Sequence, residues 1–331
     1  MRICVCRRGI TRILELLRAE LPEDDVLECS PAEVPDFART TEVLVPIAAP
    51  VSERALASPQ LLLVQQFGAG LDSVDVHSAS THGVYVANVP SGETANADSV
   101  AELAVLLMLA LARGFRQAQE NVRAGRLGAP VGMTLKGKTV AILGFGDIGR
   151  AVARRLRPFG IRILAVSRRG QRDAETEADL HVSSAAFHTV LPQADFVVVA
   201  TPLSPQTRGL VGAEAFARMK EGAFLVNVAR GAVVDRDALL GALASGKLAG
   251  AGLDVFWQEP PDPGDPIFAQ AVIATPHVGG ATDLSLREIG AAVAANVNRV
   301  RRGEAPRNCV NAGSLDLSAL QAKRDVTHAA R

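Results

Sequence analysis

The segment Gly144-Phe-Gly-Asp-Ile-Gly149 restricts the fold of this chain more than any other feature of its sequence. It directly follows the apolar run Lys138–Leu143, which predicts a strand buried on both faces, and it opens a predicted helix. In that context the first glycine permits a tight turn, the second lets a pyrophosphate approach the backbone, and the third lets helix and strand pack closely. The N-terminus of the helix offers free N–H groups to the phosphates. We therefore expect a dinucleotide site that includes Gly144, Gly146, Asp147, Ile148 and Gly149.

Strand-like runs alternate with helical patterns on both sides of this loop. Before it, a helix is predicted near Ile10–Glu20, and the strand-like runs are Arg2–Cys6, Val43–Pro46, Leu61–Gln65 and Val84–Ala87. After it, the strand-like runs are Ile161–Val166, Phe196–Ala200, Phe224–Val228, Gly250–Val255 and Val272–Thr275. The motif Ser99-Val-Ala-Glu102 resembles a capping box that opens a helix to about Arg113, followed by a further helical stretch to Arg123. This alternation indicates an α/β protein with parallel sheets.

A chain of 331 residues exceeds the usual size of a single core, so two domains are expected. We predict a Rossmann-type doubly wound parallel sheet in residues 96–283. A helix from Thr282 to about Arg302 returns the chain to the first domain. Residues 1–95 and 284–331 then form a flavodoxin-like α/β substrate domain. The segment from Gly313 to Arg331 has little apolar periodicity and is expected to be a loosely held tail.

The charge balance argues against some partners. Lys and Arg total 35, as do Asp and Glu, so no net field attracts nucleic acid or an anionic membrane. The apolar run Leu103–Ala112 is too short to span a bilayer. The four cysteines have no CxxC spacing and the start lacks a secretory signal, which favours reduced structural thiols, no metal site and a cytoplasmic location.

The end of the second strand of the dinucleotide domain bears on the cofactor. Ser167-Arg168-Arg169 stands where an NAD site would normally place a carboxylate on the ribose 2′-hydroxyl. A hydroxyl and two guanidinium groups suit a 2′-phosphate, because arginine binds it through a charged, bidentate fork. NADP is therefore the preferred cofactor, with NAD possible. The alternative is that the two arginines form only a solvated basic turn.

Three polar side chains each follow a predicted parallel strand: Arg230, Glu259 and His277. Because the carboxyl ends of parallel strands face the ligand crevice, we expect these residues to converge there. An imidazole beside a carboxylate can exchange a proton with a ligand, and a fixed guanidinium such as Arg230 can stabilise negative charge on it.

Nearly the whole chain resembles the D-isomer-specific 2-hydroxyacid dehydrogenases, the family of phosphoglycerate, glyoxylate/hydroxypyruvate and formate dehydrogenases. The matching segments, in chain order, are Phe67–Asp75, Asn96 before Ser99–Glu102, the glycine loop, Thr201–Leu203, Met219–Gly231, Gly252–Pro260 and Thr275–Gly280. The resemblance implies that Arg230 binds the substrate carboxylate and keto oxygen, that His277 is the acid/base and that Glu259 pairs with His277.

The resemblance also implies further contacts. Substrate would be bordered by Gly68, Ala69, Gly70 and Asn96, and cofactor by Thr201, Val228, Ala229, Arg230, Asp254, His277 and Gly279. A homodimer is implied as well, with helix Ser99–Arg113 as a candidate part of its interface. Trp257 departs from the family pattern, and we expect its bulk to reshape the pocket.

We therefore predict an oxidoreductase that transfers a hydride between NADP(H) or NAD(H) and a 2-keto or 2-hydroxy acid, as a reductase of glyoxylate, hydroxypyruvate or a related acid. Two alternatives stay open. One is a nucleotide-sensing, corepressor-like binding protein, and the other is a formate- or phosphite-type dehydrogenase of the same fold.

Overall fold

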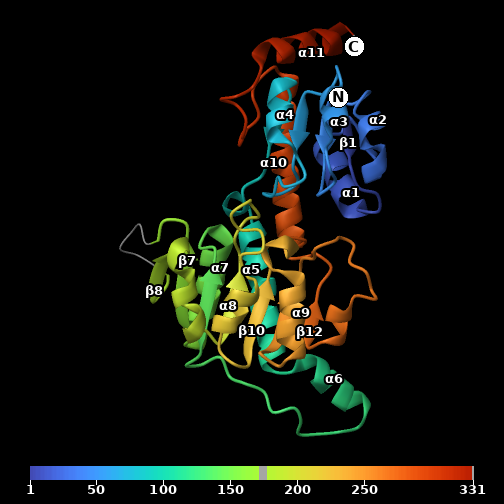
Figure 1. Ribbon diagram of the computed structural model, residues 1–331. Coiled ribbons are helices and arrows are strands. Elements are labelled where there is room, and N and C mark those ends of the chain that lie inside the picture. The colour runs from blue at the N-terminus through green and yellow to red at the C-terminus, as the bar shows by residue number, and fades with distance from the viewer. Residues whose placement is uncertain (171–176, 330–331) are drawn as a thin grey trace. The chain divides into compact units, whose positions relative to one another are not determined.

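The computed structural model describes residues 1–170 and 177–329, which form two compact units (Figure 1). One unit comprises Met1–Asn96 and Thr282–Arg331, and the other comprises Ala97–Ala281. These limits lie close to the domain boundaries expected from the sequence. In the part of the chain that is described, no helix is both long enough and apolar enough to cross a membrane.

The second unit is built on a parallel sheet of seven strands in the order β12-β11-β10-β9-β6-β7-β8. Its strands are β6 (Thr139–Leu143), β7 (Arg162–Ser167), β8 (Leu180–Ser183), β9 (Phe196–Val199), β10 (Ala223–Asn227), β11 (Leu248–Leu253) and β12 (Val272–Ala274). Its helices are α5 (Asn96–Ala112), α6 (Phe115–Arg123), α7 (Asp147–Leu156), α8 (Ala213–Arg218) and α9 (Arg236–Ala244), with short 3-10 turns η3 (Arg157–Phe159), η4 (Ser184–Thr189), η5 (Leu191–Gln193), η6 (Gly231–Val233) and η7 (Pro266–Ala269).

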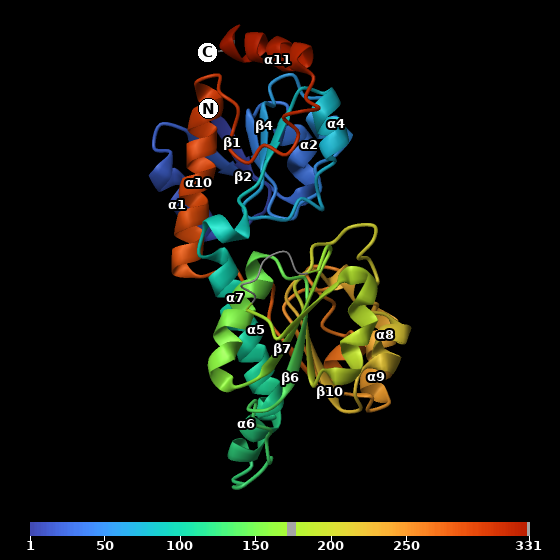
Figure 2. The same ribbon diagram turned by 90° about the vertical axis from the view of Figure 1, so that its left-hand side faces the viewer.

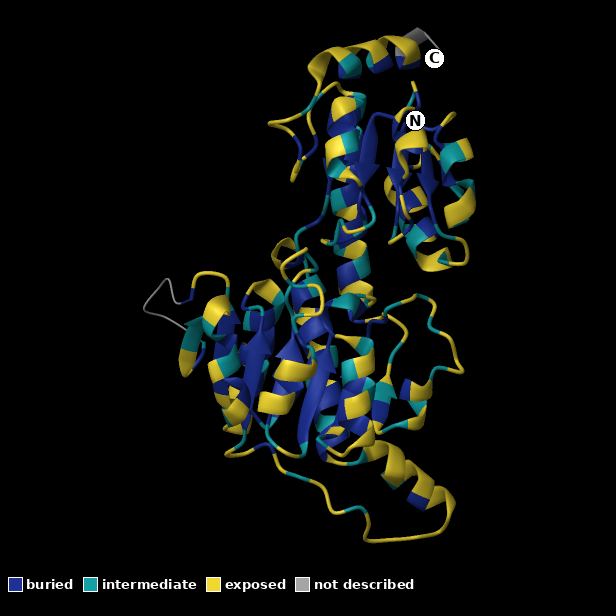
Figure 3. Ribbon diagram, in the orientation of Figure 1, coloured by how far each residue is buried: buried dark blue, intermediate teal, exposed yellow. Residues whose placement is uncertain are grey.

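Helices cover both faces of this sheet, as Figure 2 shows with α5 and α7 on one side and α8 and α9 on the other. The central strands β6, β9 and β10 are buried along their whole length, because alternate side chains pack against opposite helical layers (Figure 3). The strand order reverses between β6 and β9, the switch point at which doubly wound sheets bind ligands. The predicted Rossmann-type fold is confirmed.

The first unit contains a parallel sheet of five strands in the flavodoxin-like order β2-β1-β3-β4-β5. Its strands are β1 (Arg2–Val5), β2 (Asp25–Glu28), β3 (Val43–Val45), β4 (Leu63–Gln65) and β5 (Tyr85–Ala87). Its helices are α1 (Thr11–Glu20), α2 (Val34–Phe37), α3 (Glu53–Leu56), α4 (Val76–Thr81), α10 (Asp283–Arg301) and α11 (Leu317–Ala329), with 3-10 turns η1 (Pro31–Glu33) and η2 (Ser91–Glu93). Side chains of α1 and α10 pack on one face of the sheet, and those of α2, α3 and α4 on the other.

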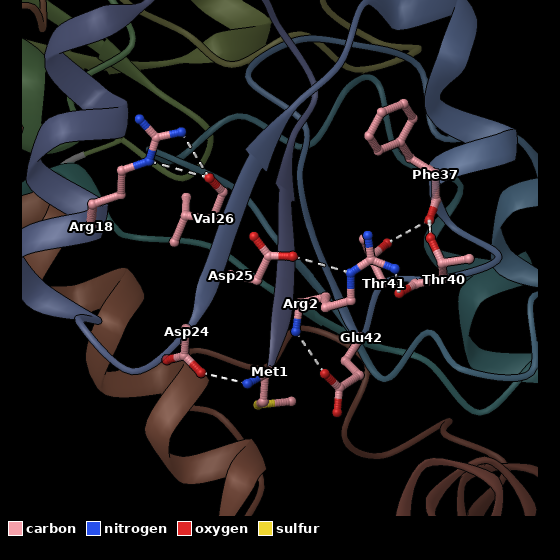
Figure 4. Close-up of polar contacts among 10 residues, drawn as sticks. All are labelled: Met1, Arg2, Arg18, Asp24, Asp25, Val26, Phe37, Thr40, Thr41 and Glu42. Carbon is pink, nitrogen blue, oxygen red and sulfur yellow. Dashed lines mark hydrogen bonds and ion pairs between the residues drawn. The ribbon is translucent and has the colours of Figure 1, made fainter. Parts of the chain in front are cut away.

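Polar contacts fix the amino end of this sheet (Figure 4). The Met1 amino group lies 2.5 Å from the Asp24 carboxylate, and the backbone N–H of Arg2 donates to Glu42 at 2.7 Å. The Arg18 guanidinium donates to the carbonyl of Val26 at 3.0 Å, which ties α1 to β2. These bonds satisfy charges and backbone groups that an unpaired strand end would leave to solvent.

Helix α5 begins earlier than the sequence indicates. It starts at Asn96, so Ser99 lies inside the helix and the capping-box prediction is wrong. Glu102 bonds instead to the guanidinium of Arg155 on α7, at 3.1 Å, and Asp98 bonds to the same group at 2.8 Å. A tertiary ion pair therefore uses the carboxylate that the local pattern assigned to a cap.

The predicted tail after Gly313 is also wrong, because α11 occupies most of it. Among the residues of α11 whose burial is described, Leu320, Lys323 and Thr327 are buried. Their spacing defines one helical face, and of these three Leu320 alone is apolar. Gly83 permits this docking: a Cβ there would lie 2.2 Å from the backbone nitrogen of Leu320. The helix is held by a mainly polar face that hydrophobic periodicity does not detect.

Lys323 is 7% exposed, and its ammonium group donates to the carbonyls of Leu56, at 3.1 Å, and Ser58. Burial lowers the pKa of this amine from 10.5 to about 8. Between these two values the unfolded chain holds a proton that the folded chain has released, so stability rises with pH across that window.

We expect the free energy of unfolding to increase by about 3 kcal/mol from pH 8 to pH 10.5 through this group, as a shift of this size implies. Urea unfolding of the wild type and of Lys323→Met across this range isolates the contribution, because the variant has no amine to titrate. Equal pH slopes for the two proteins would contradict the prediction.

Candidate active site

Most of the sequence-predicted site residues gather at one edge of the sheet in the second unit. All seven strands are parallel, so their carboxyl ends lie together. The positions at this edge are Gly144, Gly146, Asp147, Ile148 and Gly149 after β6, Ser167, Arg168 and Arg169 at the end of β7, Thr201 after β9, Val228, Ala229 and Arg230 after β10, Asp254 and Glu259 after β11, and His277 and Gly279 after β12.

The glycine loop has the backbone that a dinucleotide requires. Gly144 has φ +101°, and a Cβ there would lie 2.5 Å from the nitrogen of Thr201, on the loop that follows the neighbouring strand. A Cβ on Gly149 would lie 2.1 Å from the Gly144 carbonyl oxygen, so this glycine permits α7 to pack on β6. At Gly146, by contrast, a Cβ would meet nothing within 4 Å. The open side of the loop therefore lies in front of the N-terminus of α7, where a pyrophosphate fits.

Ser167, at the end of β7, forms hydrogen bonds through its side chain. Its Oγ lies 2.8 Å from Nε2 of His181 on the edge strand β8 and 3.3 Å from the Gly170 carbonyl oxygen. If the hydroxyl donates to the carbonyl, it accepts from the imidazole N–H, which fixes the position of Oγ. Arg168 and Arg169 are exposed beside it. Arg172, a further candidate for cofactor recognition, lies outside the described residues.

His181 belongs to none of the sequence motifs described above and was not selected as a site residue. Its ring meets the edge of Phe145 in the glycine loop at a centroid separation of 5.2 Å, and the Arg150 guanidinium lies 5.3 Å from the centre of the same Phe145 ring. Burial, and then the charge of Arg150, lower the pKa of His181. Because His181 matches no motif, only the pairing of β7 with β8 brings it to the predicted ribose site.

Glu259 and His277 form a close pair, with Nδ1 of His277 2.7 Å from Glu259 Oε2. The other carboxylate oxygen accepts the backbone N–H of Phe256 at 3.1 Å, so both oxygens are held. Burial alone would raise the pKa of Glu259, but the His277 hydrogen bond and charge, the Phe256 N–H and the charge of Arg230 together lower it. Glu259 therefore stays an anion beside the imidazole.

The His277 side chain is 40% exposed, and none of the described residues bonds to its Nε2. Since Glu259 takes Nδ1, the second ring nitrogen points away from the pair and is positioned to exchange a proton with a bound molecule. His277 has φ +54°, an uncommon value for a residue with a side chain. The surrounding loop must hold that conformation.

Asp254 provides that restraint. Its buried carboxylate accepts the hydroxyl of Thr275 at 2.7 Å and the backbone N–H groups of Val278 and Gly279, each at 2.9 Å. These bonds fix the loop on both sides of His277. The contacts within this chain make Asp254 a positioning residue for His277, and its expected place beside the cofactor stays a prediction.

Arg230 is held through its backbone. The side chain of Asn227 donates to the Arg230 carbonyl at 3.0 Å and accepts the Ala229 N–H at 3.1 Å. The Arg230 guanidinium is half-buried and donates to the Ala229 carbonyl at 2.8 Å. Its charge acts on the Glu259 carboxylate, which places it near the pair. The three catalytic candidates thus come together, and Asn227 is a positioning residue that the sequence reasoning did not select.

Trp257 joins the two loops that carry Arg230 and Glu259. Its indole N–H donates to the carbonyl of Val234 at 2.6 Å, and its ring packs against the apolar core of the unit. A Cβ on Gly231 would lie 2.1 Å from the backbone carbon of Phe256, so the loops are in direct backbone contact. This residue therefore anchors the loop of Glu259, and its expected effect on pocket shape stays a prediction.

The expected substrate-loop residues belong to the first unit. Gly68 has φ +122°, its carbonyl accepts the Val89 N–H at 2.9 Å, and the carbonyl of Ala69 accepts the Asn88 side chain at 2.8 Å. Gly70 follows in the same loop after β4. Asn96 is the first residue of α5 and donates to Ser91 at 3.0 Å. The role of these four residues in substrate binding stays a prediction.

Comparison with known proteins agrees with this geometry. The model of the D-isomer specific 2-hydroxyacid dehydrogenase, NAD binding domain, matches residues 105–279. The glyoxylate reductases of Thermococcus litoralis and Korarchaeum cryptofilum are each 37% identical to the chain, over 79% and 92% of its length and 80% and 92% of theirs.

Solved structures include a similar protein, the NADPH-dependent glyoxylate/hydroxypyruvate reductase of Sinorhizobium meliloti in complex with NADP and malonate. It superposes with a TM-score of 0.77 at 30% identity and covers 90% of this chain and 92% of its own. The similarity therefore extends over both units.

Proposed function

Since this chain belongs to the D-isomer specific 2-hydroxyacid dehydrogenases, a family of nicotinamide-dependent oxidoreductases, we propose that it reduces small 2-keto acids, glyoxylate and hydroxypyruvate foremost, with NADPH. The observation that carries the proposal is the Glu259–His277 pair, within the field of Arg230, on the same sheet edge as the glycine loop. The names of the similar glyoxylate reductases support the choice of substrate.

The cofactor would lie along the sheet edge. Gly146 and the N-terminus of α7 would hold the pyrophosphate, and Thr201, Val228 and Ala229 would border the dinucleotide on the neighbouring strands. Ser167, Arg168 and Arg169 would hold the 2′-phosphate, because a hydroxyl and two guanidinium groups can donate to it. None of the described residues from 167 to 170, at this strand end, carries a carboxylate that would repel it.

The catalytic step follows from the geometry. When bound, the nicotinamide supplies the hydride that reduces the keto carbon. Arg230 pairs with the substrate carboxylate and stabilises the negative charge that develops on the keto oxygen. His277 donates the Nε2 proton to that oxygen, while Glu259 at Nδ1 stabilises the protonated ring before transfer and fixes its orientation. The half-exposed imidazole then recovers a proton from solvent.

A steady-state panel tests this function. NADPH and NADH are each supplied with glyoxylate, hydroxypyruvate and bulkier 2-keto acids, and NAD⁺ is supplied with formate and phosphite. We expect NADPH oxidation to be fastest with the small keto acids. Turnover only in the formate or phosphite reactions would favour the alternative dehydrogenase, and absence of turnover with tight cofactor binding would favour a nucleotide sensor.

Substitution of Ser167 tests the 2′-phosphate argument. We expect Ser167→Asp to lower the NADPH/NADH ratio of kcat/KM by about 100-fold, because the new carboxylate repels the 2′-phosphate and accepts the ribose hydroxyl. Ser167→Asn is the matched control, since it has the shape of aspartate without the charge. An unchanged ratio in Ser167→Asp would place recognition elsewhere.

The homodimer is part of the proposal. Large apolar side chains stand exposed along α6 and the chain after it: Phe115, Val122, Leu127 and Val131, the last two each 95% exposed. A series of this kind is typical of a protein–protein interface. The cytoplasmic location stays a prediction.

We expect the wild type to be dimeric by light scattering and the double variant Leu127→Glu/Val131→Glu to be monomeric, because two charges at exposed apolar contacts would have to be desolvated on association. Leu317→Glu is the control: this leucine is also exposed but lies in the first unit. A monomeric wild type at assay concentration would contradict the prediction.

A further inference from the structure

Three cysteine side chains meet inside the first unit, whereas the catalytic candidates belong to the second. Cys4, Cys6 and Cys29 are each 0% exposed, and their sulfur atoms all lie within 4.8 Å of one another. The fourth cysteine, Cys309, lies apart from this cluster. The spacing of the sequence alone gave no reason to join them, since Cys29 is 23 residues beyond Cys6.

The topology of the sheet produces the cluster. Cys4 and Cys6 are two residues apart at the carboxyl end of β1, so both side chains point to the face covered by α2, α3 and α4. Strand β2 is parallel to β1, and the N–H of Cys29 donates to the Val5 carbonyl at 3.0 Å. This pairing places Cys29 opposite Cys6 on the same face. The sulfurs are therefore fixed by two adjacent strand ends.

The surroundings restrict what these sulfurs can bind. The cluster packs among apolar side chains such as Val34, Ala38 and Leu44, and no further imidazole or carboxylate joins the group in the described part of the chain. The nearby cation Arg8 is paired with Glu33 at 2.9 Å. A bound ion or metalloid would therefore have three sulfur ligands, and the complex that it forms with them would have to carry little net charge. Zinc, which normally takes four ligands in structural sites, meets the first condition poorly.

The net charge of the complex distinguishes among the ions and metalloids that bind sulfur. Three thiolates leave two negative charges around a monovalent ion, one around a divalent ion and none around a trivalent centre, and an unpaired buried charge is costly. Sulfurs bonded at about 2.3 Å to one three-coordinate centre lie at most about 4 Å apart, so the side chains need to move inward by less than about 1 Å. Side-chain rotation within the cluster covers such a distance.

We propose that Cys4, Cys6 and Cys29 form a three-sulfur binding site for a trivalent, thiophilic metalloid, with arsenite as the probe. The reaction is a condensation: As(OH)₃ and three thiols give one As(SR)₃ centre and three water molecules. Three As–O bonds break and three As–S bonds form, each thiol proton leaves with a hydroxide as water, and no oxidant or reductant is needed. The product is neutral, as the apolar surroundings require.

Entry requires only a local opening, because the chain leaves β1 through the exposed turn Arg8–Gly9 immediately after Cys6. We therefore expect binding that is slow to begin and tight once formed.

The test is titration of the intact, reduced protein with arsenite, with a phosphine in place of a thiol reductant. Native mass spectrometry should show one arsenic per chain, and reactive thiols counted after rapid denaturation should fall from four to one. Binding should also raise the thermal unfolding midpoint, because the arsenite-bound form is folded. Absence of a one-to-one complex would overturn the proposal.

Single variants establish the ligands. Cys4→Ala, Cys6→Ala and Cys29→Ala should each weaken arsenite binding by about 100-fold or more, since loss of a direct ligand costs at least as much as loss of an outer partner. Cys309→Ala is the matched control and should bind like the wild type. Unchanged affinity in any one of the first three, or loss in the control, would contradict a three-sulfur site. Keto-acid turnover by each variant verifies folding, and His277→Ala should bind arsenite normally, which separates this test from that of the proposed activity.

Discussion

Replacement of His277 by alanine is expected to lower kcat for keto-acid reduction by about 10³-fold, within the range that general acid catalysis contributes. The reason is geometric: Glu259 holds Nδ1 at 2.7 Å, which leaves Nε2 as the group that can deliver a proton to the keto oxygen. Alanine removes the donor, and water has to replace it. Single-turnover NADPH oxidation in a stopped-flow instrument measures the loss directly.

Glu259→Gln is the informative companion to this variant. The amide oxygen can still accept from Nδ1, so the ring keeps its orientation, but the negative charge beside the imidazole is gone. We expect kcat for keto-acid reduction to fall while NADPH binding, measured by fluorescence, is retained. A His277→Ala enzyme with wild-type kcat would exclude His277 as the acid.

Arg230→Ala is expected to lower kcat/KM for the keto acid by about 10³-fold, the upper part of the range for one lost oxyanion donor. The variant loses the cation that we propose pairs with the substrate carboxylate and stabilises the developing alkoxide. Arg230→Lys should recover only part of the rate, because lysine restores the charge but not the bidentate fork. Steady-state kinetics with keto acid varied at saturating NADPH provide the measurement.

The same substitution has a second, independent readout. The charge of Arg230 helps to lower the pKa of Glu259, so its removal raises that pKa and activity is lost at a higher pH on the acid side. Arg218→Ala is a suitable control, since this exposed arginine pairs with Glu214 on its own helix. If Arg230→Ala behaved like Arg218→Ala, the proposed role of Arg230 would be wrong.

Much of the fold was predictable because its signals are local. Central strands such as β6 and β9 are continuous apolar runs, and a run buried on both faces needs no knowledge of its neighbours to be recognised. The short edge strands β2 and β8 were not predicted, since sequences such as Asp25–Glu28 are polar and become strands only through pairing with β1 or β7. The helix α11 was missed for the same reason, as its buried face carries Lys323 and Thr327.

The residues of the candidate site also divide into those that local sequence reveals and those that only tertiary contacts reveal. Arg230, Glu259 and His277 were found because each follows a strand and belongs to a recognisable segment. The roles of the groups that hold site residues in place were not predicted. Asp254, expected only at the cofactor, acts through the loop of His277, and Asn227 acts through the backbone of Arg230. His181 holds Ser167. These side chains form hydrogen bonds with the backbone or with residues distant in the chain, and such contacts produce no periodic pattern in a sequence.

The sequence by itself determined the reaction chemistry and the two-sheet architecture, because glycine spacing, apolar runs and strand-end polar residues are properties of contiguous segments. The tertiary structure alone decided which polar groups position the catalytic residues, how α11 is retained and where three separate cysteines meet. Register and packing between segments distant along the chain set these outcomes, and burial of the assembled surfaces stabilises them.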